Sequence, residues 1–371
     1  MYYKGITIMT FKKTLVMSTA LCAVSMLAAN GVSAAEKPKL SISGYQETFL
    51  GLADGVTAGS SSAGTPTYSS GAKEGQFQIL QYGEIRFKAS GKTDSGMKWG
   101  VYFEDVMNDS DTAGKKDSTD EANVWMSGSW GKLEIGGQDG AADKMRVTGT
   151  KVDLMGSNVL GAFVDNTGSS LRGADNDNVM DSSDDSKITY YTPRVSGFQA
   201  GVSWVPGAGT KGTVPGGSKE GAIEAAVSFK GKTDSAKYEL TAAYSDNGDN
   251  AKAKQKGWLV GGQVTMSGVT VAAGYSKNDN WRAAASDQKA WTIGASYATG
   301  PWEVSFIHLD SKLELDAGGR DDEYTQNTLQ AAYNLGGGLT VAAGLYLFDL
   351  QDRAGTASDN DGTALIAKIN A

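Results

Sequence analysis

The sequence predicts an all-β fold, a 16-stranded antiparallel transmembrane β-barrel. Three observations predict it: sixteen stretches of alternating apolar and polar residues, connections that are by turns short and long, and an export signal at the start. Beyond that signal, no segment reaches the roughly 18 consecutive apolar residues that a membrane helix needs. Because only α-helices and closed barrels can pair all their backbone polar groups inside lipid, the alternating strands point to a barrel.

The first segment, residues 1–34, has the features of a signal peptide. Two lysines precede an apolar stretch, residues 15–29, which is followed by a small-residue processing site. Such segments are removed after export, so we expect cleavage between Ala34 and Ala35. A transmembrane anchor is the alternative, but the apolar stretch is short for a span of about 20 residues.

The composition of the mature chain excludes several classes of protein. The only cysteine, Cys22, lies in the signal segment, which excludes disulfides, thiolate metal sites and cysteine nucleophiles from residues 35–371. Removal of the three lysines of the signal takes the formal charge from -8 to -11. An acidic chain without basic clusters argues against nucleic acid as a partner. No linker divides residues 35–371, so we expect one domain there.

Residues 77–89 show the alternation most clearly. The apolar set is Phe77, Ile79, Gly83, Ile85 and Phe87, and the polar set is Gln78, Tyr82, Glu84, Arg86 and Lys88. A strand places such sets on opposite faces, whereas a helix would scatter them. The same period of two recurs in residues 98–106, 198–204, 223–230, 269–275, 291–297 and 339–347. Since the apolar face is the constant one, we expect it to contact lipid and the polar face to line the interior.

The connections between these strands fall into two kinds. The short ones are residues 91–96, 131, 193–197, 231–235, 267–268, 299–300 and 336–338, and the long polar ones are residues 55–76, 108–120, 140–186, 206–218, 246–255, 278–287, 310–320 and 351–361. Seven short turns that alternate with eight long loops join sixteen strands. Outer-membrane barrels have short turns on the periplasmic side and long loops outside.

Aromatic residues gather near both kinds of connection. Those near the short turns are Trp99, Trp130, Phe198, Phe229, Tyr238, Trp302 and Tyr333, and those near the long loops are Trp204, Tyr244, Trp258, Tyr275 and Trp291. They predict one aromatic belt at each membrane interface. A secreted β-sandwich or solenoid is the alternative, but the chain shows no second apolar set that would pack the core of either one.

Two segments resemble a known family. Residues 187–204, KITYYTPRVSGFQAGVSW, resemble the hairpin of the sixth and seventh strands in general porins of α-proteobacteria. Residues 131–145, GKLEIGGQDGAADKM, resemble the fifth strand of these porins and its exit into the third loop. The resemblance implies a trimeric, water-filled diffusion channel in the outer membrane of a Gram-negative bacterium, with the third loop folded inward as a constriction. Two positions depart from the family pattern: Gln138 follows Gly137 where some porins have a basic residue, and the chain ends at Ala371 rather than at an aromatic residue.

The interior of such a barrel is wide enough to stay aqueous unless a loop narrows it. Residues 140–186 form the longest connection and are the candidate constriction loop. The loop residues expected to shape its field are Asp143, Asp153, Asp165, Asp175 and Asp177, and the pore-wall residues are Glu84, Arg86, Lys88, Lys98, Glu104, Lys132 and Glu134. Our hypothesis is that loop carboxylates face wall cations and that the resulting transverse field orients polar solutes. For any single aspartate, an ordinary solvated loop residue is the competing interpretation.

The sequence therefore predicts passive diffusion of ions and small hydrophilic solutes, with outer-membrane lipid and lipopolysaccharide as surroundings and with no cofactor. Asp175, Asp177 and Asp181 form a weak candidate calcium site, since hard cations prefer oxygen ligands, but they lack the spacing of an EF-hand. A substrate-specific channel and a loop-mediated adhesin or receptor barrel are the alternatives. Catalysis is disfavoured because the single histidine, His308, shares its strand face with apolar residues.

Overall fold

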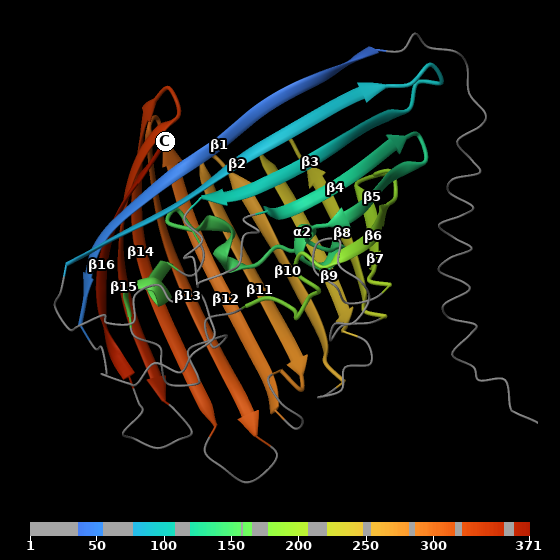
Figure 1. Cartoon of the computed structure of the whole chain (residues 1–371). Coiled ribbons are helices and arrows are strands. Elements are labelled where there is room, and N and C mark those ends of the chain that lie inside the picture. Colours follow the sequence, from blue (N-terminus) through green and yellow to red (C-terminus); the bar gives the residue numbers. More distant parts are fainter. Residues whose placement is uncertain are drawn as a thin grey trace, which may run out of the picture.

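The computed structural model describes residues 36–54, 77–107, 119–156, 159–164, 177–206, 221–247, 254–281, 286–315, 321–351 and 360–371. Its strands form one closed barrel in which each strand pairs with its neighbour in sequence and β1 pairs with β16. All sixteen pairings are antiparallel. The barrel class and the strand number predicted from the sequence are confirmed (Figure 1).

The strands follow one another along the chain as β1 (Glu36–Ala53), β2 (Gln78–Lys92), β3 (Lys98–Met107), β4 (Thr119–Gly128), β5 (Gly131–Gly137), β6 (Ser186–Tyr191), β7 (Phe198–Trp204), β8 (Ile223–Lys232), β9 (Ala236–Asp246), β10 (Lys256–Met266), β11 (Val269–Asp279), β12 (Ser286–Thr299), β13 (Trp302–Leu315), β14 (Asp322–Gly336), β15 (Leu339–Gln351) and β16 (Asn360–Asn370). The described residues between β5 and β6 form three short helices: α2 (Ala141–Lys144), the 3₁₀ helix η2 (Gly149–Val152) and α3 (Val159–Phe163). The connection that carries them, residues 138–185, is called the inner loop below.

The two ends of the barrel chain meet in one ladder. Gln46 donates its backbone N–H to the carbonyl of Ala371 at 2.9 Å, and Ala371 returns a bond to Gln46 at 3.0 Å. This pairing leaves no free sheet edge between the first and last strands. At the short-turn end, the connection between β10 and β11 is only Ser267 and Gly268, both with positive φ (50° and 82°), as a two-residue hairpin turn of matching twist requires.

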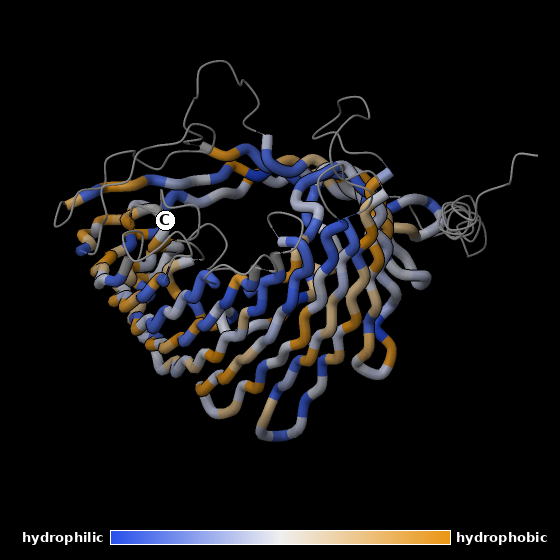
Figure 2. The backbone as a smooth tube through the Cα atoms, turned by 90° about the horizontal axis from the view of Figure 1, so that it is seen from below, coloured by the Kyte–Doolittle hydropathy of each residue, from blue (hydrophilic) through white to orange (hydrophobic). Residues whose placement is uncertain are grey.

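The two faces of the barrel wall differ as the alternation predicts. On β2, the side chain of Ile85 is 36% exposed on the outer face, whereas Glu84 is 5% exposed on the inner face. Leu240 on β9 is 55% exposed and its neighbour Thr241 is 6% exposed. Figure 2 shows the closed ring of strands and the change of hydropathy from residue to residue along them. The outward apolar face is the one available to lipid.

Aromatic rings contact one another near both ends of the strands. Near the short turns, Phe198 lies 4.5 Å from Phe229 and Trp302 lies 4.6 Å from Tyr333, measured between ring centroids. Near the long-loop end, Trp258 lies 5.3 Å from Tyr275. These outward aromatic pairs match the two belts predicted from the sequence.

The expectation that the chain has no second apolar set is wrong. An apolar cluster lies inside the barrel, where α3 and the residue Met155 pack against the inner faces of β1 and β13–β16. Its members include Phe49, Phe163, Tyr324, Tyr346 and Ile366, each less than 9% exposed. On β15 both faces are apolar, because Tyr346, Phe348 and Leu350 point inward while Leu345 and Leu347 point outward. Such a strand has no period of two, so the inward set is hidden in the sequence.

No helix among the described residues has the length and apolar character needed to cross a membrane.

Candidate functional site

The described parts of the inner loop lie inside the barrel, where hydrogen bonds join them to several wall strands. Backbone N–H groups of the loop donate to Ser203 on β7 (from Ala141, 2.8 Å), Asn278 on β11 (from Met180, 2.7 Å), Thr292 on β12 (from Gly149, 2.7 Å) and Gln330 on β14 (from Leu154, 2.8 Å). A loop taken out of water needs such partners for its backbone, since an unpaired buried N–H group is costly. Side chains of the wall strands therefore act as the hydrogen-bond acceptors that water would provide for the backbone of a solvent-exposed loop.

Glu224 on β8 joins the two arms of the inner loop. Its side chain is 1% exposed, and its carboxylate accepts bonds from the backbone N–H of Ala142 at 3.1 Å and of Ser182 at 2.9 Å. The hydroxyl of Ser182 donates to the same carboxylate. Because Ala142 lies in the outgoing arm and Ser182 in the returning arm, one buried side chain fixes the distance between them.

Lys187 on β6 makes the complementary contact. Its ammonium group, on a side chain that is 1% exposed, donates to the backbone carbonyls of Gln138 and Ser183. Gln138 stands where some porins carry a basic residue, and here a lysine on the neighbouring strand binds its carbonyl. Glu224 and Lys187 together hold the neck of the inner loop, the region where residues 138–142 and 182–185 are joined through these two side chains. No local sequence pattern predicted this role for either residue.

A row of glycines on the inner wall makes room for the inner loop. A Cβ atom on Gly261 of β10 would lie 1.9 Å from the carbonyl oxygen of Val147, and one on Gly294 of β12 would lie 2.3 Å from that of Gly149. On Gly274 of β11 it would lie 2.9 Å from Thr148. No side chain fits at these distances, so the close approach of loop backbone to wall depends on glycine.

The far end of the inner loop is held by a lysine. Lys368 on β16 is 7% exposed, and its ammonium group donates to the carbonyl of Met155 at 3.0 Å and to Glu47 on β1 at 3.1 Å. The apolar cluster around α3 surrounds this contact. The inner loop thus has a polar anchorage at its neck and a mainly apolar one at its far end.

Three of the predicted pore-wall residues form one network on β2 and β3. Arg86 donates through Nε to Glu104 at 2.9 Å and also pairs with Glu84. The hydroxyls of Tyr45 and Tyr82 each donate to Glu84 at 2.7 Å. All these side chains lie on the inner face of the wall, so both carboxylates are satisfied around a single guanidinium.

The other predicted wall residues lie nearer the short turns. Lys88 sits 5.1 Å from the ring centroid of Tyr102, and Lys132 sits 5.3 Å from that of Trp125 and pairs with Glu134 at 2.5 Å. The positions opposite Lys98 across the two ladders are Lys92 and Ser127. These lysines give the wall of β2–β5 a stripe of cations below the Arg86 network.

The predicted loop aspartates divide into those with observed partners and those outside the described residues. Asp143 pairs with Arg146 at 3.3 Å and accepts a bond from Asn178 at 2.9 Å. Asp153 accepts from Gln330 at 2.6 Å, and Asp177 accepts from Thr292 at 2.9 Å. Asp165 and Asp175 lie outside the described residues, as do the signal segment and its predicted cleavage site at Ala34 and Ala35.

The one ion pair observed between the described part of the inner loop and the β1–β5 wall has an unexpected polarity. Lys144 of the loop lies 3.6 Å from Glu134 of β5, so a loop cation meets a wall carboxylate. The hypothesis expected the reverse arrangement. Here the wall contributes a carboxylate to the contact. Glu134 is 5% exposed and lies between two ammonium groups, that of Lys132 on the wall and that of Lys144 on the loop.

Three carboxylates meet beside the neck of the inner loop. Oxygen atoms of Glu121, Asp139 and Asp184 lie within 4.8 Å of one another. Burial, with the nearby carboxylates of Asp143, Asp184, Glu121 and Asp181, raises the pKa of Asp139 to about 8. Two members of the calcium candidate are described elsewhere in the loop: Asp177 binds Thr292, and Asp181 accepts from Asn178 at 3.2 Å.

His308 lies on the outer side of β13. Its ring centroid is 4.8 Å from that of Trp291, and Nδ1 is 2.9 Å from the side-chain oxygen of Asn327. Its side chain therefore lies in the aromatic belt near the long loops and points away from the interior of the barrel.

Comparison with known proteins supports one family. A sequence profile of Gram-negative porins matches residues 18–353. The anion-selective porin from Comamonas acidovorans has a similar structure, with a TM-score of 0.62 at 15% identity over 90% of this chain and 99% of that one. A loop-deletion mutant of the Vibrio cholerae outer-membrane protein OmpT gives 0.62 at 12% over 91% and 100%, and a mutant of Rh. blastica porin gives 0.55 at 19% over 90% and 100%. No curated protein matches the sequence.

The carboxylate of Glu224 predicts how the inner loop responds to its removal. In Glu224→Ala, the N–H groups of Ala142 and Ser182 lose their acceptor, which costs about 1–3 kcal/mol for each group left unpaired. We expect trypsin to cleave after Lys144 about tenfold faster or more, while the barrel keeps its resistance to unfolding. Glu314→Ala, on the outer face, is the matched control. Equal cleavage rates in Glu224→Ala and the wild type would show that this carboxylate does not hold the loop.

Asp139 predicts a pH-dependent loop neck. Because the folded pKa lies above the ordinary value of about 4, the folded state retains the proton; this contribution to stability is complete below about pH 4 and is lost as the pH rises through about 8. We expect the backbone amides of residues 138–144 to exchange hydrogen faster above that pH, after correction for intrinsic exchange. Asp139→Asn should abolish the change and Asp185→Asn should keep it. Constant protection across this range in the wild type would contradict the assignment.

Proposed function

The chain belongs to the Gram-negative porin family, and from this premise we propose that the inner loop and the β1–β5 wall form the constriction of its channel. The protein is an outer-membrane channel for passive diffusion. The observation that carries the proposal is the position of the inner loop, which is bonded to the inner faces of β7–β14 and approaches β5 through the pair of Lys144 with Glu134. Solutes that cross the barrel then pass between loop and wall.

The charges on the two sides of this passage support a transverse field. Among the wall residues predicted from the sequence, four cations (Arg86, Lys88, Lys98 and Lys132) stand with three carboxylates (Glu84, Glu104 and Glu134). The described parts of the inner loop carry more aspartates than basic residues, even when Asp139 is protonated. We therefore keep the hypothesis of a loop that is more negative than the wall, with the local exception at Lys144. Such a field orients dipolar, hydrophilic solutes and disfavours apolar ones.

The outer face of β1–β3 supports assembly into a homotrimer. Gln46, Gln81 and Asp105 are polar residues on a face that is otherwise apolar. Within the described residues, Asp105 Oδ1 is buried and accepts no hydrogen bond. Polar side chains are costly on a face that would otherwise meet lipid, so we propose that this face packs against a second copy. One of the similar solved structures, that of Vibrio cholerae OmpT, is a trimer form.

The outer face of β11–β14 supports contact with lipopolysaccharide. Above the upper aromatic belt, lysines and carboxylates pair on the outside of the barrel: Lys277 with Asp279 at 2.8 Å, Lys289 with Glu314 at 2.7 Å and Lys312 with Asp321 at 2.9 Å. Charged groups at this level stand outside the hydrocarbon layer. We propose that they lie among the headgroups of the outer leaflet.

Alternative functions gain less support. The family and fold are those of channels, and the outward position of His308 gives a catalytic role no basis, so we propose none. The adhesin alternative depends on outer loops that lie largely outside the described residues. A preference for particular solutes is the one alternative that an observed feature favours, and that feature is a cavity beside the inner loop.

Planar-bilayer recordings test the proposed channel. We expect wild-type protein to insert with three equal conductance steps, as a trimer requires. Arg86→Gln removes the cation between Glu84 and Glu104, so the ratio of cation to anion permeability should rise several-fold. Lys289→Gln, on the outer face, should leave this ratio unchanged. No conductance would refute the channel, and an unchanged ratio in Arg86→Gln would remove Arg86 from the constriction.

A further inference from the structure

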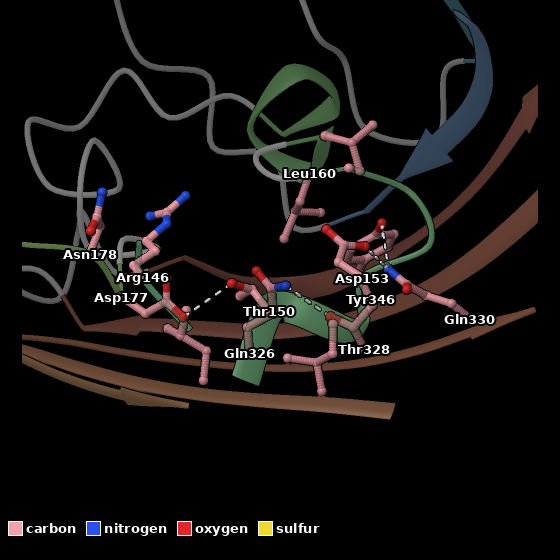
Figure 3. Close-up of a pocket in the computed structure, with 14 residues that line it drawn as sticks. Arg146, Thr150, Asp153, Leu160, Asp177, Asn178, Gln326, Thr328, Gln330 and Tyr346 are labelled. Atoms are coloured by element: carbon pink, nitrogen blue, oxygen red, sulfur yellow. Dashed lines mark hydrogen bonds between the residues drawn. The ribbon is translucent and has the colours of Figure 1, made fainter. Parts of the chain in front are cut away.

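A cavity lies between the inner loop and the inner faces of β13–β15. Its volume is about 240 Å³, and it is lined both by loop residues and by wall residues (Figure 3). Sites for drug-sized ligands are usually larger, about 300–1,000 Å³, so this cavity suits one small solute. No role in the diffusion channel as described above requires it.

One end of the cavity carries charges of both signs. Arg146 and Asp177 lie at the same end (Figure 3). Arg146 uses Nε to pair with Asp143 at 3.3 Å, and among the described residues its two terminal NH₂ groups make no recorded hydrogen bond. Asp177 is 5% exposed, and its Oδ2 accepts bonds from Thr292 at 2.9 Å and Thr150 at 3.2 Å. These hydroxyls fix the orientation of the carboxylate.

Aliphatic side chains line another part of the cavity. Leu160 of α3 extends from above, and Val159, Ile307 and Leu309 are lining residues that are all less than 9% exposed. They belong to or border the apolar cluster that anchors the inner loop. Thr328 and Gln326, the ladder partners of Ile307 and Leu309 on β14, line the cavity beside them. A ligand part in this region therefore meets an aliphatic side, which favours an apolar group, next to a polar one.

The second acid of the cavity, Asp153, serves the fold. Its Oδ1 accepts from Gln330 at 2.6 Å and from the backbone N–H of Met155 at 2.9 Å. Gln330 in turn accepts from the N–H of Leu154 at 2.8 Å. This network ties the loop to β14, so Asp177 is the carboxylate left to meet a ligand beside Arg146.

We propose that this cavity is a subsite for free α-amino acids with an aliphatic side chain. The proposal rests on the channel function above and specifies a solute class for it. Arg146 would bind the α-carboxylate and Asp177 would bind the α-ammonium group. These two groups are attached to the same carbon atom of an amino acid, which matches the position of Arg146 and Asp177 at the same end of the cavity. The side chain would fill the space beside Ile307 and Leu309.

Other small solutes fit this arrangement less well. A simple anion would be repelled by the carboxylates of Asp153 and Asp177, and a simple cation would be repelled by the guanidinium group of Arg146. A sugar would place some of its hydroxyl groups against Leu160, Ile307 and Leu309, while Gln326 and Thr328 on β14 would bind others, so glucose is the competing solute that the test includes. Because the site opens into a conducting channel, its binding has to be weak enough for release.

Ion-current recordings with a series of solutes test the subsite. Leucine added to the long-loop side should reduce the current through wild-type channels at millimolar concentration. Isopentylamine lacks the carboxylate of leucine, 4-methylpentanoate lacks its ammonium group and glycine lacks its side chain. Each of the three should therefore bind at least about tenfold more weakly than leucine. Equal effects of leucine and any one of these, or a stronger effect of glucose, would overturn the proposal.

Variants connect the effect to the cavity. Arg146→Gln and Asp177→Asn should each weaken the leucine effect about tenfold, whereas Lys151→Gln, an exposed loop residue outside the cavity, should not. A full leucine effect in both cavity variants would overturn the site. Open channels without any leucine effect would refute the subsite and leave the channel standing. If the protein did not conduct, saturation-transfer NMR of leucine in detergent would still decide whether the subsite exists.

Discussion

The pairing of every backbone polar group within the wall is the constraint on which the rest of this structure depends. Lipid offers no hydrogen-bond partner, so sixteen strands that cross it have to close on themselves. Closure here joins β1 to β16 through the backbone of Gln46 and Ala371. Once the wall is closed, side chains have only two directions, and the alternation of residues decides which ones meet lipid and which ones meet water.

The inner loop applies the same constraint a second time, inside the barrel. Its backbone cannot form a ladder with the wall, so side chains take the place of one: Glu224, Thr292, Asn278 and Gln330 accept from loop N–H groups. Glycine at Gly261 and Gly294 lets backbone approach backbone. The loop is therefore a packed part of the protein with defined contacts on most of its described length, and its charges are held at fixed positions opposite the β1–β5 wall.

How much could be predicted from the sequence depended on whether a signal was local. Strands and turns were predictable because an alternating run such as that around Ile85 and a turn such as Gly268 carry their own pattern. The inward positions of Arg86 and Glu104 followed from strand parity, whereas the ion pair between them was not predicted. The inner apolar cluster did not, because β15 is apolar on both faces and Tyr346 looks no different from its outward neighbours.

The roles of Glu224, Lys187 and the inner-wall glycines Gly261, Gly274 and Gly294 were not predictable either, since each depends on a segment distant in sequence. Glu224 looks like any lumen-facing acid until Ala142 and Ser182 are placed beside it. In the same way, Asp177 looked like one of several solvated loop acids, but threonines of the loop and the wall orient it within a cavity.

Thiol labelling of single cysteines in liposomes tests the orientation of the wall most directly. The only native cysteine is Cys22, within the predicted signal, and Lys230 and Leu240 lie on paired strands, away from β1–β3, with side chains on opposite faces. We expect Lys230→Cys to react with a charged, water-soluble reagent and Leu240→Cys to react only with a reagent dissolved in the lipid. The opposite pattern would mean that the apolar face lines the interior and that the orientation of the wall described here is wrong.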